Sequence, residues 1–267
     1  MRWSFSIGKC FGIPVRVHAT FFLLLALVAF VAYRPDAGGA MTVWPMALVL
    51  AIFACILGHE LAHSLVARRF GVEVDSITLL PIGGMASITG LPRKAWQEVV
   101  IAVAGPAFSL AVAGVVYVVL RLAGESFDPR NVFADRALKV STAWGALAAL
   151  GPINVVIAVV NLFPAFPLDG GRVLRGVLAL KLPLVKATRI AASIGETAAV
   201  FLILYGLMSG NIWLIVIGIF LLMGALSEEQ SVEIDAVFED MKVKRVMLTE
   251  FERTDEGTRM LDVVDTI

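Results

Sequence analysis

Long, uninterrupted apolar runs dominate the pattern of this chain. A transmembrane helix needs about 20 consecutive apolar residues. Runs near that length occupy residues 17–33, 46–67, 96–120, 144–163, 188–208 and 212–226. Each run is predominantly apolar, as a transmembrane helix requires. The pattern therefore predicts six transmembrane helices, with only residues 209–211 separating the last two.

A different pattern fills the interval between the second and third runs. Residues 71–90 are rich in Val, Ile and Thr, alternate in part, and contain the turn residues Pro81 and Gly83. This composition favours a β-hairpin near the membrane, and residues 13–17 also alternate and could add a strand to it. An ordinary cytosolic connector fits residues 71–90 equally well. The expected fold class is an all-α polytopic membrane protein of six transmembrane helices with a small membrane-associated hairpin or sheet.

Composition and charge agree with this architecture. Hydrophobic residues make up 59% of the chain and charged residues 16%, and the mean hydropathy is +0.87, which excludes an ordinary soluble domain. The 22 basic and 22 acidic residues balance, so no basic surface indicates nucleic acid as a partner. Lys and Arg are most frequent before the first run and in the segments after the second and fourth runs. The positive-inside rule then places both termini in the cytoplasm of a multi-pass inner-membrane protein.

The end of the chain is different in composition. Residues 228–240 contain several acidic residues and no Lys or Arg, which indicates an exposed helix or linker. We therefore expect a membrane domain over residues 1–226 and a cytosolic part over residues 227–267. Cys10 and Cys55 are separated by the first run, so a disulfide between them is not expected.

Candidate chemistry lies inside the second apolar run, at the HELAH sequence of residues 59–63. Residues four apart share one face of a helix, roughly 6 Å apart along its axis, so His59 and His63 can bind one metal ion. Glu60 would then lie beside the metal, where a carboxylate can act as general base toward a water held there. An ionisable residue in mid-membrane costs about 3 kcal/mol, which favours a function for Glu60 over a chance match.

A catalytic zinc site needs three protein ligands, and Asp169 is the candidate for the third. It belongs to NLFPAFPLDGG at residues 161–171, where prolines end the fourth run. The pair Gly170 and Gly171 is expected to let the chain bend sharply after Asp169. With the N-terminus inside, the second and fourth helices both run from outside to inside. His59, His63 and Asp169 should therefore meet near the cytoplasmic surface of the membrane.

Together, HELAH and NLFPAFPLDGG resemble the motifs of the site-2 protease family of intramembrane metalloproteases, and the resemblance covers residues 8–226. It implies one catalytic Zn²⁺ ion bound by His59, His63 and Asp169, with Glu60 as the general base. It also implies that Asn161 holds the substrate or stabilises the oxyanion. The substrates of such an enzyme are membrane proteins in the lipid bilayer, cut within or near a transmembrane segment in regulated intramembrane proteolysis.

A second, shorter resemblance concerns residues 242–267, which are similar to the first strand and helix of a CBS domain. In this family such domains bind adenine nucleotides. The sequence stops before a nucleotide pocket would be complete, so nucleotide regulation is expected only through a CBS region that is incomplete here, and no nucleotide-binding residue is assigned.

Other readings of these residues remain. A membrane metal-ion transporter or channel could use the same His, Glu and Asp cluster, but it would place polar residues through the full membrane depth. Cys55, one turn before His59, could also bind zinc, although helix packing is the more common role of such a residue. His18 could face the site or lie at the membrane interface. Glu196 could line a substrate gate or pair with Arg189.

Overall fold

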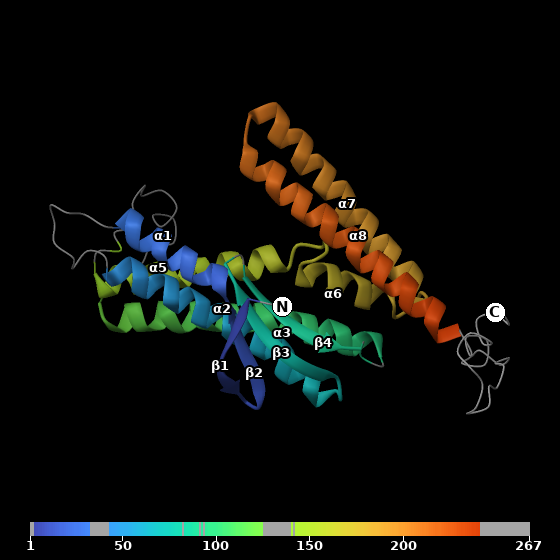
Figure 1. Ribbon diagram of the computed structural model, residues 1–267, viewed down its shortest axis with the longest axis horizontal. Helices are drawn as coiled ribbons and strands as arrows, with labels where there is room; N and C mark the ends of the chain where they lie inside the picture. Colours follow the sequence, from blue (N-terminus) through green and yellow to red (C-terminus); the bar gives the residue numbers. More distant parts are fainter. Residues whose placement is uncertain are drawn as a thin grey trace, which may run out of the picture.

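The computed structural model describes residues 3–32, 43–81, 83–90, 92, 94–124, 140 and 142–240. Within these residues the protein is mostly helical and carries one sheet of four strands (Figure 1). Both findings agree with the expected fold class of a helical membrane protein with a small sheet.

Five helices have the length and apolar character needed to cross a membrane. They contain between 19 and 29 residues, which corresponds to about 28 to 44 Å at a rise of 1.5 Å per residue, against roughly 30 Å of hydrocarbon. These helices are α2 (Val43–Arg69), α3 (Ala95–Leu122), α5 (Ala143–Asn161), α7 (Leu184–Ser209) and α8 (Ile212–Asp240). The second to sixth predicted spans are therefore confirmed as helices of spanning length.

The first predicted span differs. Its residues 17 and 18 belong to a strand, and the helix that follows, α1 (Ala19–Ala32), has 14 residues. Such a helix is about 21 Å long, which is shorter than the hydrocarbon core. Residues 33–42 lie outside the described part of the chain. The count of six spans is therefore not confirmed.

The sheet contains the strands β1 (Ser4–Cys10), β2 (Ile13–His18), β3 (Glu73–Leu80) and β4 (Gly83–Thr89). They lie in the order β1-β2-β3-β4. The hairpin β3–β4 is antiparallel, and β2 joins it in parallel with Val15 opposite Ile77. Both elements were predicted from the alternating residues, whereas β1, which pairs antiparallel with β2, was not. The edges of the sheet are thus β1 and β4.

The sheet packs on the half of α2 that carries the HELAH sequence. Ile13 of β2 and Ile77 of β3 form a buried cluster with Leu61 of α2. Further along α2, Phe53 packs with Phe21 of α1, the two rings meeting edge to face. Burial of these side chains fixes the sheet relative to the residues of the motif.

Helices α2, α3 and α5 lie side by side, and the α7–α8 hairpin leans away from them (Figure 1). Small residues allow close helix contacts. A Cβ at Gly218 of α8 would lie 2.9 Å from the carbonyl oxygen of Ala199 in α7. Helix α8 continues to Asp240, so the predicted boundary between residues 226 and 227 falls inside one helix. The CBS-like residues 242–267 lie outside the described part of the chain.

The short helix α6 (Asp169–Leu178) follows the loop of residues 162–168. The expectation of a bend after Asp169 was wrong, because Gly170 and Gly171 lie in the first turn of α6. The chain turns before Asp169 instead. A Cβ at Gly171 would lie 2.7 Å from the backbone nitrogen of Phe166, and a Cβ at Gly170 would collide with backbone carbonyls of the loop. The two glycines therefore let α6 pack directly on the loop that precedes it.

Candidate active site

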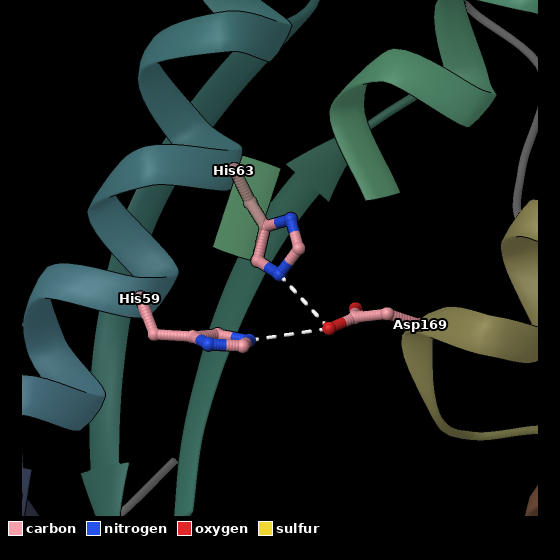
Figure 2. A group of neighbouring side chains, drawn as sticks. All are labelled: His59, His63 and Asp169. Carbon is pink, nitrogen blue, oxygen red and sulfur yellow. Dashed lines mark hydrogen bonds and ion pairs between the residues drawn. The ribbon is translucent and has the colours of Figure 1, made fainter. Parts of the chain in front are cut away.

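The two histidines of the HELAH sequence present their rings from successive turns of α2. His59 and His63 are both buried, and their ring centroids lie 4.8 Å apart. Figure 2 shows both imidazoles pointing toward one oxygen of the Asp169 carboxylate, which enters from the start of α6. The structure thus brings together the three residues that the sequence indicated as metal ligands.

The distances within this group suit a zinc ion. Nε2 of His59 and Nε2 of His63 each lie 3.1 Å from Oδ2 of Asp169. Two ligands of a tetrahedral zinc ion at ordinary bond lengths are about 3.3 Å apart. Burial acts to raise the pKa of the Asp169 carboxyl, but its contacts with the two imidazoles outweigh burial and lower the pKa to about 2. Asp169 is therefore an anion at neutral pH, as a metal ligand must be.

The remaining ring nitrogens are held by α3. Nδ1 of His63 lies 2.7 Å from the carbonyl oxygen of Ile101, to which it must donate. A neutral His63 then directs the lone pair of Nε2 at the Asp169 carboxylate, which is also an acceptor. Two acceptors at 3.1 Å need a proton or a metal cation between them. The Nδ1 atom of His59 lies 2.9 Å from Oγ of the buried Ser109, which can accept a hydrogen bond from the Nδ1–H group.

Space for an ion is left by a glycine of α3. A Cβ at Gly105 would collide with Nε2 of both His59 and His63. Any other residue at position 105 would therefore occupy the volume toward which the ligand nitrogens point. The open volume faces two imidazoles and one carboxylate, a ligand set that fits the preferences of zinc.

Glu60 lies next to this group without joining it. Its carboxylate makes no hydrogen bond or ion pair with another residue in the described ranges. The nearest wall is β4, because a Cβ at Gly84 would lie 2.5 Å from Cγ and 3.2 Å from Oε1 of Glu60. His59 and His63 are among the groups close enough to interact with it electrostatically. A free carboxylate beside the metal ligands is arranged as a general base requires.

The structure does not bring Asn161 into this group. Asn161 is the last residue of α5, and its Nδ2 donates to the carbonyl oxygen of Ile157 at 2.9 Å. The amide has a second N–H group, so the predicted role in substrate or oxyanion binding stays a prediction. Cys55 is absent from the potential metal ligands of the described residues. Both cysteines are free thiols, as expected.

Two further expectations have clear outcomes. Nδ1 of His18 lies 2.7 Å from Oγ1 of Thr20, which places His18 in a local contact at the end of β2. Arg189 pairs with Glu229 and Glu233 of α8, at 3.1 and 2.5 Å, rather than with Glu196. The pairing of Glu196 with Arg189 is therefore wrong, because the α7–α8 hairpin brings two nearer carboxylates.

The sequence analysis missed the contribution of α3. Ile101, Gly105 and Ser109 follow one another at intervals of four residues and share the face of α3 that meets the histidines. A small residue and a hydroxyl at this spacing in an otherwise apolar helix is the signal that could have indicated this face.

Comparison with known proteins agrees with the geometry. The family model described as Peptidase family M50 matches residues 47–142 and 126–204. The chain is 35% identical over 247 residues to a zinc metalloprotease of Methanocaldococcus jannaschii, covering 92% of this chain and 67% of that protein. A Synechocystis sp. protein is 34% identical over 249 residues, covering 88% of this chain and 62% of that protein. The chain thus spans about two thirds of the length of these relatives.

A solved structure gives the same result. The site-2 protease from Methanocaldococcus jannaschii matches with a TM-score of 0.59 and 31% sequence identity, over 95% of this chain and 100% of that chain. Sequence and fold therefore agree on one assignment. The chain belongs to peptidase family M50, the family of the site-2 zinc metalloproteases.

Proposed function

We propose that this protein hydrolyses a peptide bond within or near the transmembrane segment of another membrane protein, close to the cytoplasmic surface. The observation that carries the proposal is the convergence of His59, His63 and Asp169 around a space kept open by Gly105, with Glu60 free beside it. Substrate recognition and the assignment of individual roles below are part of this proposal.

His59, His63 and Asp169 would hold the zinc ion. When bound, zinc supplies a Lewis acid that makes water more acidic and polarises a carbonyl group. Glu60 accepts the proton of the attacking water and delivers it to the leaving amine nitrogen. The carboxylate can do both because it has no fixed partner among the described residues and lies against the backbone of Gly84.

The proposed role of Asn161 is to bind the oxyanion or the substrate backbone. One of its amide N–H groups is bonded to Ile157, and the other is available to donate. A donor placed where negative charge develops stabilises the transition state. Asn161→Ala should therefore reduce kcat while zinc content stays unchanged.

The substrate presents a difficulty of its own, because every carbonyl of a helical span is already hydrogen-bonded. The helix must open before it can be cut. Strand β4 is an edge of the sheet, so one side of its backbone has no strand partner among the described residues. Edge strands can pair with an extended peptide. A substrate strand paired with β4 would lie next to Gly84 and therefore next to Glu60.

We further infer that both termini lie in the cytoplasm and that the protein sits in the inner membrane. The distribution of Lys and Arg supports this orientation. A sixth span over residues 17–33 stays a prediction from sequence. Adenine-nucleotide regulation through the CBS-like residues 242–267 stays a prediction from sequence alone.

The proposal is tested with purified protein and a single-span model substrate. Wild-type protein loaded with zinc should cleave it, and mass spectrometry should map the cut to the transmembrane segment or its border. Glu60→Gln should lower kcat by at least about a thousandfold while retaining zinc, since it removes only the base. His59→Ala should lose zinc, and chelation should abolish cleavage reversibly.

The competing function, metal transport, predicts a different result. Protein in liposomes would carry zinc across the bilayer, and Glu60→Gln would change that flux. Robust flux without any peptide-bond cleavage would overturn the protease assignment.

A further inference from the structure

A cavity of about 220 Å³ begins at His63 and extends between α3, α6 and the distal part of α8. One water molecule occupies about 30 Å³ in the liquid, so the cavity can hold several waters or the end of a peptide. Its charged lining consists of Glu98, Arg172, Arg175 and Glu228. The cavity thus connects the ligand group to a set of ionic side chains that catalysis, as derived above, does not use.

Three of these side chains form one cluster of ion pairs. Arg175 is 2% exposed, and its Nε donates to Oε1 of Glu98 at 2.7 Å. Its Nη2 lies 2.5 Å from the same oxygen, and its Nη1 donates to Oε1 of Glu228 at 2.7 Å. The guanidinium of Arg175 thus contacts the two carboxylates through all three of its nitrogens, and both carboxylates of the cavity wall have a cationic partner.

Arg172 is different, although it lies on the same helix and lines the same cavity. It is partly buried and makes no hydrogen bond or ion pair with a residue in the described ranges. Glu60 and Glu98 are close enough for electrostatic interaction with Arg172, but neither is hydrogen-bonded or ion-paired to it. Its five N–H donors are thus available to a ligand inside the cavity.

A planar guanidinium with free donors is best complemented by a carboxylate, which can accept two parallel hydrogen bonds. Hydrolysis of a peptide bond produces one such group, because the acyl fragment leaves with a new C-terminal carboxylate and the other fragment with an amine. The acyl carbon reacts beside His63, where the cavity begins. Glu98 and Glu228 would repel a departing carboxylate, but Arg175 offsets one of their two negative charges and Arg172 can offset the other.

We propose that Arg172 forms a carboxylate-binding site in this cavity and that its ligand is the new C-terminus of the cleaved substrate. The site would draw this fragment away from the metal ligands and so favour product release. This inference rests on the proposed proteolytic function.

The test measures peptide binding rather than turnover. Zinc-loaded full-length protein carrying Glu60→Gln, which prevents cleavage, is titrated with an N-acetylated Ala-Leu-Ala-Leu peptide by calorimetry. Three forms of the peptide are compared. The first has a free C-terminal carboxylate, the second a C-terminal amide, and the third a C-terminal amide and one added glutamate residue. Because zinc contributes equally to all variants, a difference between variants reports on the guanidinium.

We expect Arg172→Gln to weaken binding of the free carboxylate roughly tenfold or more and to leave the amide unchanged. Arg172→Lys should keep part of the affinity, since it retains the charge but loses the bidentate geometry. Lys181→Gln, which removes an exposed charge just beyond α6 and outside the cavity, is the matched control and should bind like the parent protein.

Two results would overturn the inference. Arg172→Gln could bind the free carboxylate as tightly as the parent while its zinc content is unchanged. Alternatively, the amidated peptide with a glutamate side chain could bind more tightly than the free C-terminus, which would assign the site to an acidic residue of the substrate. Cleavage by wild-type protein is measured in parallel, so failure of the proteolytic function is recognised independently.

Discussion

At the scale of single residues, the orientation of the metal ligands depends on groups outside the HELAH motif. Ser109 is fully buried, and its hydroxyl meets Nδ1 of His59 across 50 residues of sequence. Ile101 plays the same part for His63 through its carbonyl oxygen. Such partners fix the tautomer and the ring direction of a ligating histidine. Their loss typically lowers metal affinity by about 10- to 100-fold.

Replacing Ser109 with alanine should therefore raise the dissociation constant for zinc by about 10- to 100-fold, because His59 loses the acceptor that orients it. The measurement is a competition titration against a chelating dye. Ser64→Ala is the matched control, since Ser64 is also fully buried on α2 but its hydroxyl has no hydrogen-bond partner in the described part of the chain. Equal effects of the two substitutions would contradict the orienting role of Ser109.

At the scale of secondary-structure elements, glycines set how closely the elements approach the site. Gly105 brings α3 against the two imidazoles, and Gly84 brings β4 against Glu60. Gly171 packs α6 on the loop before Asp169. The first two contacts join segments that are distant in sequence, and each of the three would be lost if a side chain separated the backbones. The edge strand β4 thereby lies beside Glu60, the proposed general base.

A proline in β4 tests whether this edge binds the substrate. Ser87→Pro removes a backbone N–H and should lower kcat/KM for a transmembrane substrate at least several-fold, while zinc affinity stays unchanged. Ser87→Ala keeps the backbone donor, and Ser87 is exposed, so this variant should cleave like the parent. Undiminished cleavage by a folded Ser87→Pro protein would exclude pairing at this position.

At the scale of the whole molecule, the ligand group lies near one end of α2. His63 is six residues from Arg69, the last residue of that helix, or about 9 Å along its axis. The bilayer orientation therefore decides from which compartment water reaches the site. The positive-inside rule assigns this end to the cytoplasm.

Labelling of single cysteines tests this orientation. In a background with both natural cysteines replaced by serine, Lys181→Cys should react with a membrane-impermeant maleimide only from the cytoplasmic side. Asn211→Cys, between α7 and α8, should react only from the opposite side. Both positions are exposed, so their difference reflects sidedness rather than burial. The reverse pattern of labelling would place the site toward the outside.

Much of the architecture follows from local pattern. Five spanning helices, the β3–β4 hairpin and the strand at residues 13–17 are determined by runs and alternation of apolar residues, because lipid and sheet burial act on each segment separately. Local pattern did not determine the length of α1, because residues 17 and 18, the first two of the predicted span, belong to strand β2 of the sheet. The role of Gly170 and Gly171 also depended on what packs against them.

The candidate site was likewise predictable from the sequence only in part. Two histidines four residues apart on one helix, with a carboxylate between them, already define two ligands and a base from sequence, and the prolines and Asp169 indicate the third ligand. Tertiary structure alone decided that α3 supplies Gly105 and Ser109, that β4 lies against Glu60, and that Arg175 is neutralised while Arg172 is not. These features arise from packing between segments far apart in the chain, so the sequence of one segment does not specify which partner it meets.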